Sequence, residues 1–507
     1  MPGMSECVAF IDVGTNSVHV LVVSFRGGSL GTQIYHDKES VRMGKSLYET
    51  GTLDTATLNK LRVVLSKFAR IAKEQGAEEI IAMATCAARE APNRQELVDL
   101  AKESGIDLRI IPGREEARLV RLGVAGPECA RRTLCIDVGG GSTEIALAYG
   151  NRDLYLDSLS LGAIRMAYGT GIDQTGRVTP KEYETLKRKV AAQCYHSAAA
   201  VRDFGFDRVI GSSGTIEVIA DVCGIRRGDN DSSYITRSEL RSLMKQLCSM
   251  TASERCRIPK ISANRADIVI GGGCVVEGLM DLFGIDVMEV SPNGLREGMK
   301  MDYLLKKGHS DFSLRDSSVK ELATRCGHDT GHEASVRRYA EMLYREFVSV
   351  GILEPSDTMR ELLLYAALLH DVGSFISYER HHVFSYTIIR NSFLAGFDSG
   401  ELERMALMAR FHHGSFPDAG SRFFTGMDSR DVAEILRYAM ILKMADIMDR
   451  GRDDAIEDVS AEMLNGTVNL TVSAFSDVSL VEWKLATVDR DFAAVFGSRL
   501  NVTYLRI

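Results

Sequence analysis

Two short segments of the chain combine an acidic residue with glycine and small polar side chains, a pattern that suits phosphate chemistry. They read Ile11-Asp-Val-Gly-Thr-Asn-Ser17 and Ile136-Asp-Val-Gly-Gly-Gly-Ser142. Glycine in a tight turn leaves backbone N–H groups free to converge on an anion, and hydroxyl or amide side chains add donors. A carboxylate beside bound phosphate needs a cation between them, and Mg²⁺ with oxygen ligands suits that position. We therefore expect Asp12 and Asp137 to face a metal ion.

The two segments differ at one place that bears on the chemistry. Aligning Asp12 with Asp137 sets His19 against Glu144, so only the second segment has a further acid seven residues after its aspartate. On an alternating strand, Glu144 would point either into a cleft or to solvent. Three glycines alone indicate no more than a tight hairpin, but a second similar loop favours two half-domains that face each other across a cleft.

Two more clusters lie between these loops. Arg89 follows the apolar run 79–85. Ligand-binding residues of open α/β sheets collect at strand ends, although a solvated arginine would occupy the same place. The segment Gly113-Arg-Glu-Glu-Ala-Arg-Leu119 begins a helix. Acids in a first helical turn usually interact with the helix dipole, so Glu115 and Glu116 have a structural explanation as well as a catalytic one.

Two differently built halves of the chain must position these residues. In the first half, short apolar runs alternate with segments whose apolar residues have helical spacing, which predicts an α/β fold with parallel strands. The predicted strands are 7–12, 18–25 and 79–85, and the predicted helices are 54–75 and 114–124. In the second half, helical spacing covers 318–350, 358–370, 381–396, 399–413 and 428–450, and strand-like runs cover 467–473 and 500–506.

A polar stretch separates the halves. We place a linker at 306–316, ahead of a helix that Ser317 or Ser318 would cap with Glu321 as its partner. The composition changes across it, since nine of ten cysteines precede residue 275 and eight of eleven histidines follow residue 305.

The composition also restricts the class of protein. The chain has 507 residues, 45% of them hydrophobic, and a net charge of −8. That charge argues against a protein that coats nucleic acid or a membrane surface. No apolar run is long enough to span a membrane, no secretory signal is recognisable, and the cysteines are dilute and form no C-x-x-C pair. We therefore expect a cytoplasmic protein.

Taken together, the motifs resemble those of the exopolyphosphatase and guanosine pentaphosphate phosphatase family, within the actin-like, sugar-kinase-like ATPase superfamily. The matching segments are the two loops, Ala84–Arg89, Gly113–Leu119 and Gly211–Thr215, in the family's order. The resemblance implies an α/β fold of two actin-like (ribonuclease H-like) lobes, at 1–125 and 126–305, followed by a mostly helical HD-like region at 317–507. Gly211–Thr215 and Gly271–Gly273 would shape the far side of the cleft or form simple turns between strand and helix.

The same resemblance implies Mg²⁺-dependent hydrolysis of the terminal phosphate of linear inorganic polyphosphate. The alternatives are hydrolysis of the 5′ γ-phosphate of guanosine pentaphosphate (pppGpp), a non-catalytic regulator that binds pppGpp or ppGpp, and a kinase that uses ATP. We prefer polyphosphate, because a long anion needs contacts beyond the cleft and the added region can supply them. The resemblance also suggests a homodimer.

The family resemblance also implies roles for individual residues. Glu116 is the expected base that deprotonates the attacking water, with Glu115 as the alternative. Asp137 and Glu144 are the expected Mg²⁺-side acids. The expected phosphate-contacting residues are Asp12, Gly14, Thr15, Asn16, Ser17, Arg89, Gly139, Gly140, Gly141 and Ser142.

The second half resembles metal-dependent HD phosphohydrolases. His332, the pair His370-Asp371, and Asp446 stand at the expected ligand positions, and such a set suits a divalent transition metal. A helical domain with hydrogen-bonded core histidines would show the same residues. Phe384 stands where many relatives have histidine, which argues against a second metal ion and against catalysis there. His412 and His413 would then be available for phosphate.

Overall fold

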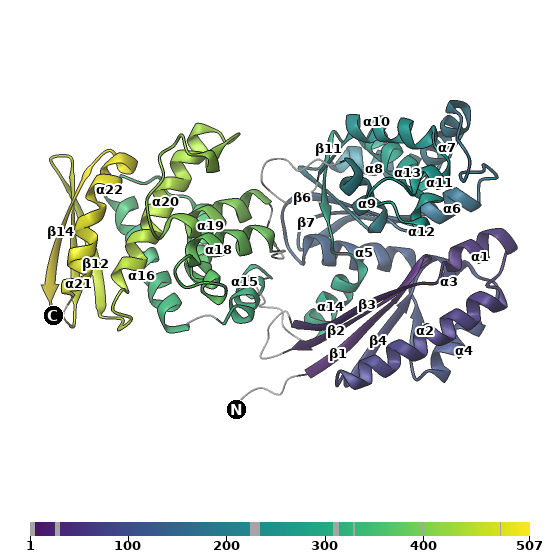
Figure 1. Cartoon of the computed structure of the whole chain (residues 1–507), viewed down its shortest axis with the longest axis horizontal. Helices are drawn as coiled ribbons and strands as arrows, with labels where there is room; N and C mark the ends of the chain where they lie inside the picture. The colour runs from purple at the N-terminus through teal and green to yellow at the C-terminus, as the bar shows by residue number, and fades with distance from the viewer. Residues whose placement is uncertain are drawn as a thin grey trace. The chain divides into compact units, whose positions relative to one another are not determined.

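The structure, a computed structural model, describes residues 6–25, 31–223, 234–307, 314–327, 330–392, 394, 396–397, 399–476 and 478–507 (Figure 1). The chain divides into two compact units, of which the first ends at Leu314 and the second runs from Arg315 to Ile507. Within the described residues, no helix is long and apolar enough to cross a membrane.

The first unit contains two mixed sheets. The first sheet has the order β3-β2-β1-β4-β5. Its strands are β1 (Glu6–Val13), β2 (Ser17–Phe25), β3 (Thr32–Ser40), β4 (Glu79–Ala84) and β5 (Leu108–Ile110). The helices that follow along this part of the chain are α1 (Met43–Thr50), α2 (Thr55–Glu74), α3 (Cys86–Glu90), α4 (Arg94–Glu103) and α5 (Gly113–Ala125).

The second sheet has the order β10-β11-β9-β6-β7-β8. Its strands are β6 (Cys129–Val138), β7 (Thr143–Gly150), β8 (Arg152–Leu159), β9 (Arg208–Ser212), β10 (Tyr234–Thr236) and β11 (Val287–Ser291). The helices along this part of the chain are α6 (Ala163–Tyr168), α7 (Pro180–Gln193), α8 (Tyr195–Phe204), α9 (Gly214–Cys223), α10 (Arg237–Cys248), α11 (Ala252–Arg255), α12 (Ala263–Ala266), α13 (Val269–Phe283) and α14 (Leu295–Lys306).

The two sheets repeat one topology. In the first, β1 pairs antiparallel with β2 and parallel with β4; in the second, β6 pairs antiparallel with β7 and parallel with β9. The expectation of parallel strands therefore holds only in part. A loop of a few residues between β1 and β2 can close a hairpin, whereas a parallel crossover needs a dozen residues or more.

Helices α5 and α14 connect the two sheets. Helix α5 packs against β6, β7 and β8, while α14 packs against β1 and against α5 itself. The helices cross closely because glycines meet: a Cβ on Gly123 would contact the backbone of Gly294 and Gly298, and one on Gly298 would contact the backbone of Leu119. The first turn of α14 is thereby fixed against the second half of α5, the helix whose first turn carries Glu116.

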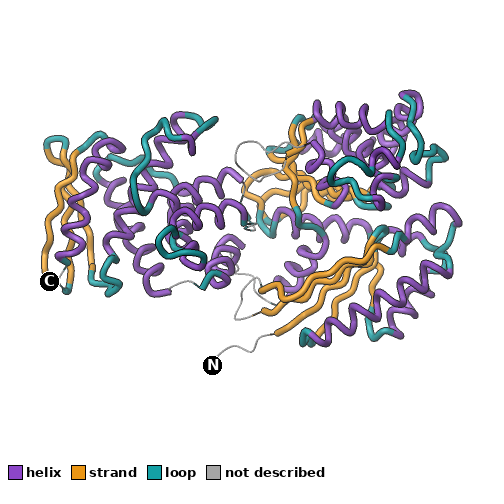
Figure 2. Tube along the Cα trace, in the orientation of Figure 1, coloured by secondary structure: helices purple, strands orange, loops and turns teal. Residues whose placement is uncertain are grey.

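The second unit is mostly helical, and Figure 2 shows its one sheet at the end that carries the C-terminus. Its helices are α15 (Leu314–Arg325), α16 (Thr330–Ser349), α17 (Asp357–Leu369), α18 (His381–Asn391), α19 (Ser399–Phe411), α20 (Ser429–Met448), α21 (Ser479–Leu485) and α22 (Asp489–Phe496), with short 3-10 helices at Val372–Phe375, Arg422–Phe424 and Ala486–Val488. The sheet has the order β12-β13-β14, formed by Ile456–Leu464, Thr467–Ala474 and Arg499–Arg506. The residues of its hydrophobic core lie between Val319 and Leu500 in the sequence.

Two boundaries differ from the expectation. The predicted helix 318–350 is two helices, α15 and α16, and α15 begins at Leu314 rather than near Ser317 or Ser318. The last residues of the predicted linker therefore belong to a helix, while residues 308–313 lie outside the described part of the chain.

Candidate active site in the first unit

The two repeated loops adopt the same turn. The N–H of Gly14 donates to the carbonyl of Ser17 at 3.0 Å, and the N–H of Gly139 donates to the carbonyl of Ser142 at 3.0 Å. Across the hairpins, Asp12 pairs with His19 and Asp137 pairs with Glu144. The residues that align between the two loops in the sequence therefore occupy equivalent positions in the two hairpins.

A cavity of about 470 Å³ lies between these loops. Most of the predicted site residues line it: Asp12, Gly14, Thr15, Asn16, Ser17, Glu116, Asp137, Gly139, Gly140, Ser142 and Glu144. Gly141 and Arg89 do not. A Cβ on Gly141 would lie 2.7–2.8 Å from Tyr48, Cys86 and Thr15, so this glycine permits packing behind the loop.

Glu116 and Glu115 have different surroundings. Glu116 lies in the first turn of α5, is 6% exposed and lines the cavity. Its Oε2 accepts a hydrogen bond from Arg89 at 3.1 Å. Glu115 instead forms a bidentate ion pair with Arg118 at 2.7 and 2.8 Å. Helix geometry therefore directs one acid into the cavity and the other to a neighbouring arginine.

Burial sets the ionisation of Glu116. It raises the pKa of this carboxyl to about 7, Arg89 opposes the rise, and the negative charges of Asp12 and Asp137 add to it. Arg89 is itself held by the carbonyl of Ile111 at 2.8 Å. Arg89 lines a smaller neighbouring hollow with Gly113 and does not line the main cavity. It therefore contacts Glu116 from the side opposite the cavity and can hold this carboxylate in place.

Three further acids face the cavity, of which Glu144 is buried and Asp12 and Asp137 are partly buried. Asp137 accepts a hydrogen bond from Ser212 at 2.6 Å, and Glu144 accepts one from Ser158 at 2.8 Å. Burial raises the pKa of Asp12 to about 7 and that of Asp137 to about 6. Burial also raises the pKa of Glu144, and the nearby charge of Glu116 adds to the rise.

These acids fit a divalent cation. Oδ1 of Asp12 is buried without a hydrogen-bond partner among the described residues. Buried carboxylates are stable in ionised form only when positive charge compensates them, and oxygen donors are the ligands that Mg²⁺ takes. The donor set therefore suits the Mg²⁺ that the sequence led us to expect.

Three cationic residues that were not expected from the sequence also line the cavity. Lys38 comes from the edge strand β3, Arg265 from α12 and Arg296 from the first turn of α14, and all three line the cavity. Burial lowers the pKa of Lys38, as does the nearby Arg265. Arg296 follows a strand end and a Pro-Asn-Gly turn, which is the one sequence signal that could have indicated it.

The two other glycine motifs have different locations. Gly214 and Thr215 line the cavity, and Ser213 donates to the carbonyl of Val138 at 2.7 Å. Residues 271–273 instead lie inside α13 and pack against other helices, so the expectation of a turn or cleft loop is wrong for them. From the sequence alone, three consecutive glycines in a loop cannot be distinguished from three glycines at a close contact between helices.

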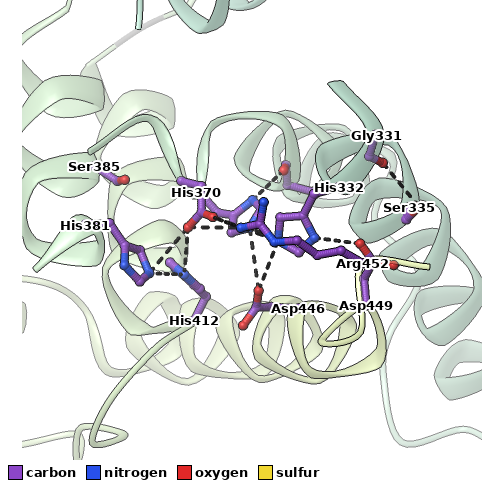
Figure 3. A network of polar contacts seen from close by, with 12 residues as sticks. Gly331, His332, Ser335, His370, His381, Ser385, His412, Asp446, Asp449 and Arg452 are labelled. Carbon is purple, nitrogen blue, oxygen red and sulfur yellow. Dashed lines mark hydrogen bonds and ion pairs between the residues drawn. The ribbon is translucent and has the colours of Figure 1, made fainter. Parts of the chain in front are cut away.

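In the second unit, the predicted metal ligands also lie together. Nε2 of His332 is 3.4 Å from Oδ1 of Asp446 and 3.3 Å from Nε2 of His370. Asp371 lies 3.8 Å from His370 and 3.9 Å from His332. His381 and His412 also face the carboxylate of Asp371, at 3.3 and 3.6 Å, although neither was expected in this cluster (Figure 3).

Comparison with known proteins supports the family resemblance over most of the chain. Residues 21–307 match the Ppx/GppA phosphatase family, and residues 314–491 match domain III of the Ppx/GppA phosphatases. A guanosine-5′-triphosphate,3′-diphosphate pyrophosphatase of Vibrio atlanticus is 26% identical over 86% of this chain and 86% of its own length. Exopolyphosphatase 1 of Mycobacterium tuberculosis is 30% identical over 61% of this chain and 91% of its own length.

Among solved structures, an exopolyphosphatase from Cytophaga hutchinsonii superimposes with a TM-score of 0.54 and 26% identity. The match covers 59% of this chain and 98% of that one.

Proposed function

Because the chain belongs to the Ppx/GppA phosphatase family, we propose that this phosphoanhydride hydrolase is an exopolyphosphatase, which removes the terminal phosphate of inorganic polyphosphate. The observation that carries the proposal is the arrangement around Glu116. This acid shares one cavity with both glycine loops and with Asp12, Asp137 and Glu144, whereas its neighbour Glu115 is paired with Arg118.

The chain's own groups supply the parts of the reaction. Backbone N–H groups of the two loops hold the terminal phosphate, and Glu116 orients a water molecule in line with the bond to be broken. The water oxygen bonds to phosphorus, its proton passes to Glu116, and the bridging oxygen leaves with the shortened chain. A base with a pKa of about 7 is well matched to neutral pH. Mg²⁺ held by Asp137 and Glu144, when bound, would neutralise charge on the phosphate oxygens.

The lining of the cavity favours polyphosphate over pppGpp. Lys38, Arg265 and Arg296 offer positive charge to successive phosphates. Among the described residues that line the cavity there is no Phe, Tyr or Trp on which a guanine ring could stack. Hydrolysis of pppGpp, the activity in the name of the Vibrio relative, is the second candidate because both reactions use the same terminal group.

Phosphate release from long-chain polyphosphate and from pppGpp, measured side by side with Mg²⁺, tests this assignment. We expect a higher kcat/KM for polyphosphate. A higher value for pppGpp would assign the chain to the second candidate, and tight nucleotide binding without phosphate release would identify a regulator.

Three further features belong to the proposal. We expect a homodimer, a location in the cytoplasm and no binding of nucleic acid, the last because the net charge is −8. Light scattering of the purified protein tests the dimer directly.

A further inference from the structure

The carbonyl oxygens of the second glycine loop are held by helix α6. The N–H of Ala163 donates to the carbonyl of Gly139 at 2.9 Å, and the N–H groups of the next two residues donate to the carbonyl of Gly140 at 2.8 and 3.1 Å. Nε of Arg165 donates to the carbonyl of Gly141 at 2.6 Å. The first turn of α6 therefore engages three consecutive carbonyls of this loop.

Helix α1 and the residues before it hold the first loop in the same way. The N–H of Gly44 donates to the carbonyl of Thr15 at 2.9 Å, and the N–H groups of Val41 and Arg42 donate to the carbonyl of Asn16 at 3.1 and 2.8 Å. Helix α1 follows β3 and α6 follows β8, which are the equivalent strands of the two sheets. The repeat therefore includes the helices that hold the loops, and these two helices pack against each other (Figure 1).

These contacts decide which way the peptide groups of the loops face. In a planar trans peptide, the C=O of one residue and the N–H of the next point in opposite directions. Because the carbonyls of residues 139–141 are turned to α6, the N–H groups of the residues that follow them point away from that helix. Gly140 and Ser142 line the cavity, as do Asn16 and Ser17, which follow the held carbonyls of the first loop. Donors rather than carbonyl oxygens are thereby presented to an anion in the cavity.

Arg165 also binds the part of the chain that forms the first sheet. Its Nη2 donates to both carboxylate oxygens of Glu90 in α3, at 2.6 and 2.7 Å, and its guanidinium lies 4.7 Å from the ring centre of Tyr48 in α1. Glu90 follows Arg89, whose guanidinium contacts Glu116. One short helix, α3, is therefore bonded to the proposed base and to a phosphate-binding loop at the same time.

Arg42 makes the reciprocal connection, from the first sheet's part of the chain to the second. It precedes α1 and has a left-handed backbone conformation, with a φ of 60°, which residues other than glycine rarely adopt. Its Nη2 donates to the hydroxyl of Tyr168 at 3.2 Å and to the carboxylate of Asp267, and Tyr168 donates to the same carboxylate. Tyr168 ends α6, and Asp267 follows α12, which carries Arg265 of the cavity lining.

We propose that Arg42 and Arg165 are positioning residues for phosphate hydrolysis, an inference that rests on the proposed function. The two arginines form a reciprocal clasp that fixes the arrangement of the glycine loops, so that N–H groups of both loops converge on one terminal phosphate. Through α3 the clasp also fixes the place of that phosphate relative to Glu116. Neither arginine is among the described residues that line the cavity, so both act on the reaction through the loops.

Arg208 provides a matched control within the same unit. Its Nε and Nη2 form a bidentate pair with Glu289 at 2.7 to 3.0 Å, and its side chain is 22% exposed, against 16% for Arg165. Arg208 begins β9, whose other end, Ser212, is the residue that contacts Asp137. A change to lysine replaces a planar fork by a single ammonium group in either place, so both variants should lose a similar amount of stability.

Binding of inorganic phosphate to the full chain, measured by calorimetry with Mg²⁺ present, tests the clasp without any turnover. Arg165→Lys and Arg42→Lys should each raise the Kd by about tenfold, because each costs an oriented donor to the anion. Arg208→Lys should bind phosphate like the wild type. Weaker binding in a chain that hydrolyses no polyphosphate would support the clasp and reject only the proposed function. A wild type that binds no phosphate, or wild-type Kd in either clasp variant folded by circular dichroism, would overturn the proposal.

The kinetic test separates kcat from KM. Misplaced loops should lower kcat for polyphosphate by about 10–10²-fold in Arg165→Lys, while KM changes little because the cations of the cavity bind the rest of the chain. Glu90→Gln leaves Arg165 in place and should lower kcat less. The double variant should be no slower than Arg165→Lys alone, because both changes break the same link. Additive losses would contradict the clasp, as would a normal kcat in Arg165→Lys whose Tm falls as far as that of Arg208→Lys.

Discussion

At the residue scale, the chemistry depends on acids whose environment the sequence did not fully specify. That Asp12, Glu116 and Asp137 line one cavity was expected from the two glycine-rich loops and from the family resemblance. The cations Lys38 and Arg296 were not expected there, because each comes from a separate element, Lys38 has no motif of its own, and the Pro-Asn-Gly turn before Arg296 is common to many loops. Only the folded chain brings their charges beside the acids.

Removal of single metal-side acids should change the response to Mg²⁺. Asp137→Asn and Glu144→Gln each remove one negative charge from the cavity, so the Mg²⁺ concentration for half-maximal rate should rise and the maximal rate should fall. Phosphate release titrated with Mg²⁺ measures both. Unaltered titration curves for both variants would show that these acids do not act on the metal side.

The raised pKa values predict how Mg²⁺ and pH act on stability. The pKa is about 7 for both Asp12 and Glu116, so without metal these buried groups favour the folded state at low pH. This contribution is lost as pH rises from about 4 through about 7, because folding then requires buried negative charge. Mg²⁺ should therefore raise the Tm more at pH 8 than at pH 5. An equal rise at both pH values, in thermal melts followed by circular dichroism, would contradict this linkage.

At the scale of elements, periodic and buried segments were predicted well. Helix α2 and strand β1 differ from their expected bounds by about one residue, because their apolar residues recur with a clear period. Strands β3 and β12 were missed because they are largely exposed and rich in charged residues, as edge strands often are. The separation of α15 from α16 was missed, although Gly327, with a φ of 66°, is the kind of glycine that ends a helix.

The close crossing of α5 and α14 should be sensitive to one added methyl group. In Gly298→Ala the new Cβ would press on the backbone of Leu119 and displace the helix that carries Glu116. Overpacking of this kind costs about 1–3 kcal/mol, so the Tm should fall together with kcat. Gly176→Ala is the control, since its Cβ would find the nearest atom at an ordinary 3.6 Å. Wild-type Tm and kcat in Gly298→Ala would show that this crossing does not position the site.

At the scale of the whole molecule, each unit has its own hydrophobic core. The Mycobacterium relative matches this chain over 317 residues and 91% of its own length, so a protein of about the size of the first unit exists by itself. We therefore expect the first unit to fold without residues 315–507.

Truncation should separate catalysis from the binding of long chains. In the second unit Arg337, Arg338, Arg345 and Arg360 line a hollow of about 450 Å³. Glu341 in the same lining pairs with Arg345 and Arg360, and Asp454 pairs with Arg338, so the hollow keeps a smaller net positive charge for a polyanion. Without residues 315–507, hydrolysis of very short polyphosphates should persist, while long chains bind more weakly and with a smaller salt dependence. Binding of long polyphosphate that is as tight and as salt-sensitive as in the full chain would contradict this role.

The most direct test of the whole account compares two neighbouring acids. Glu116→Gln keeps the size of the side chain and its contact with Arg89 but removes the proton acceptor, so kcat for polyphosphate should fall by roughly 10²–10⁴ with little change in KM. Glu115→Gln loses only the ion pair with Arg118 and should retain most of the activity. Near-normal turnover in Glu116→Gln, together with loss of activity in Glu115→Gln, would contradict the assignment of the catalytic base.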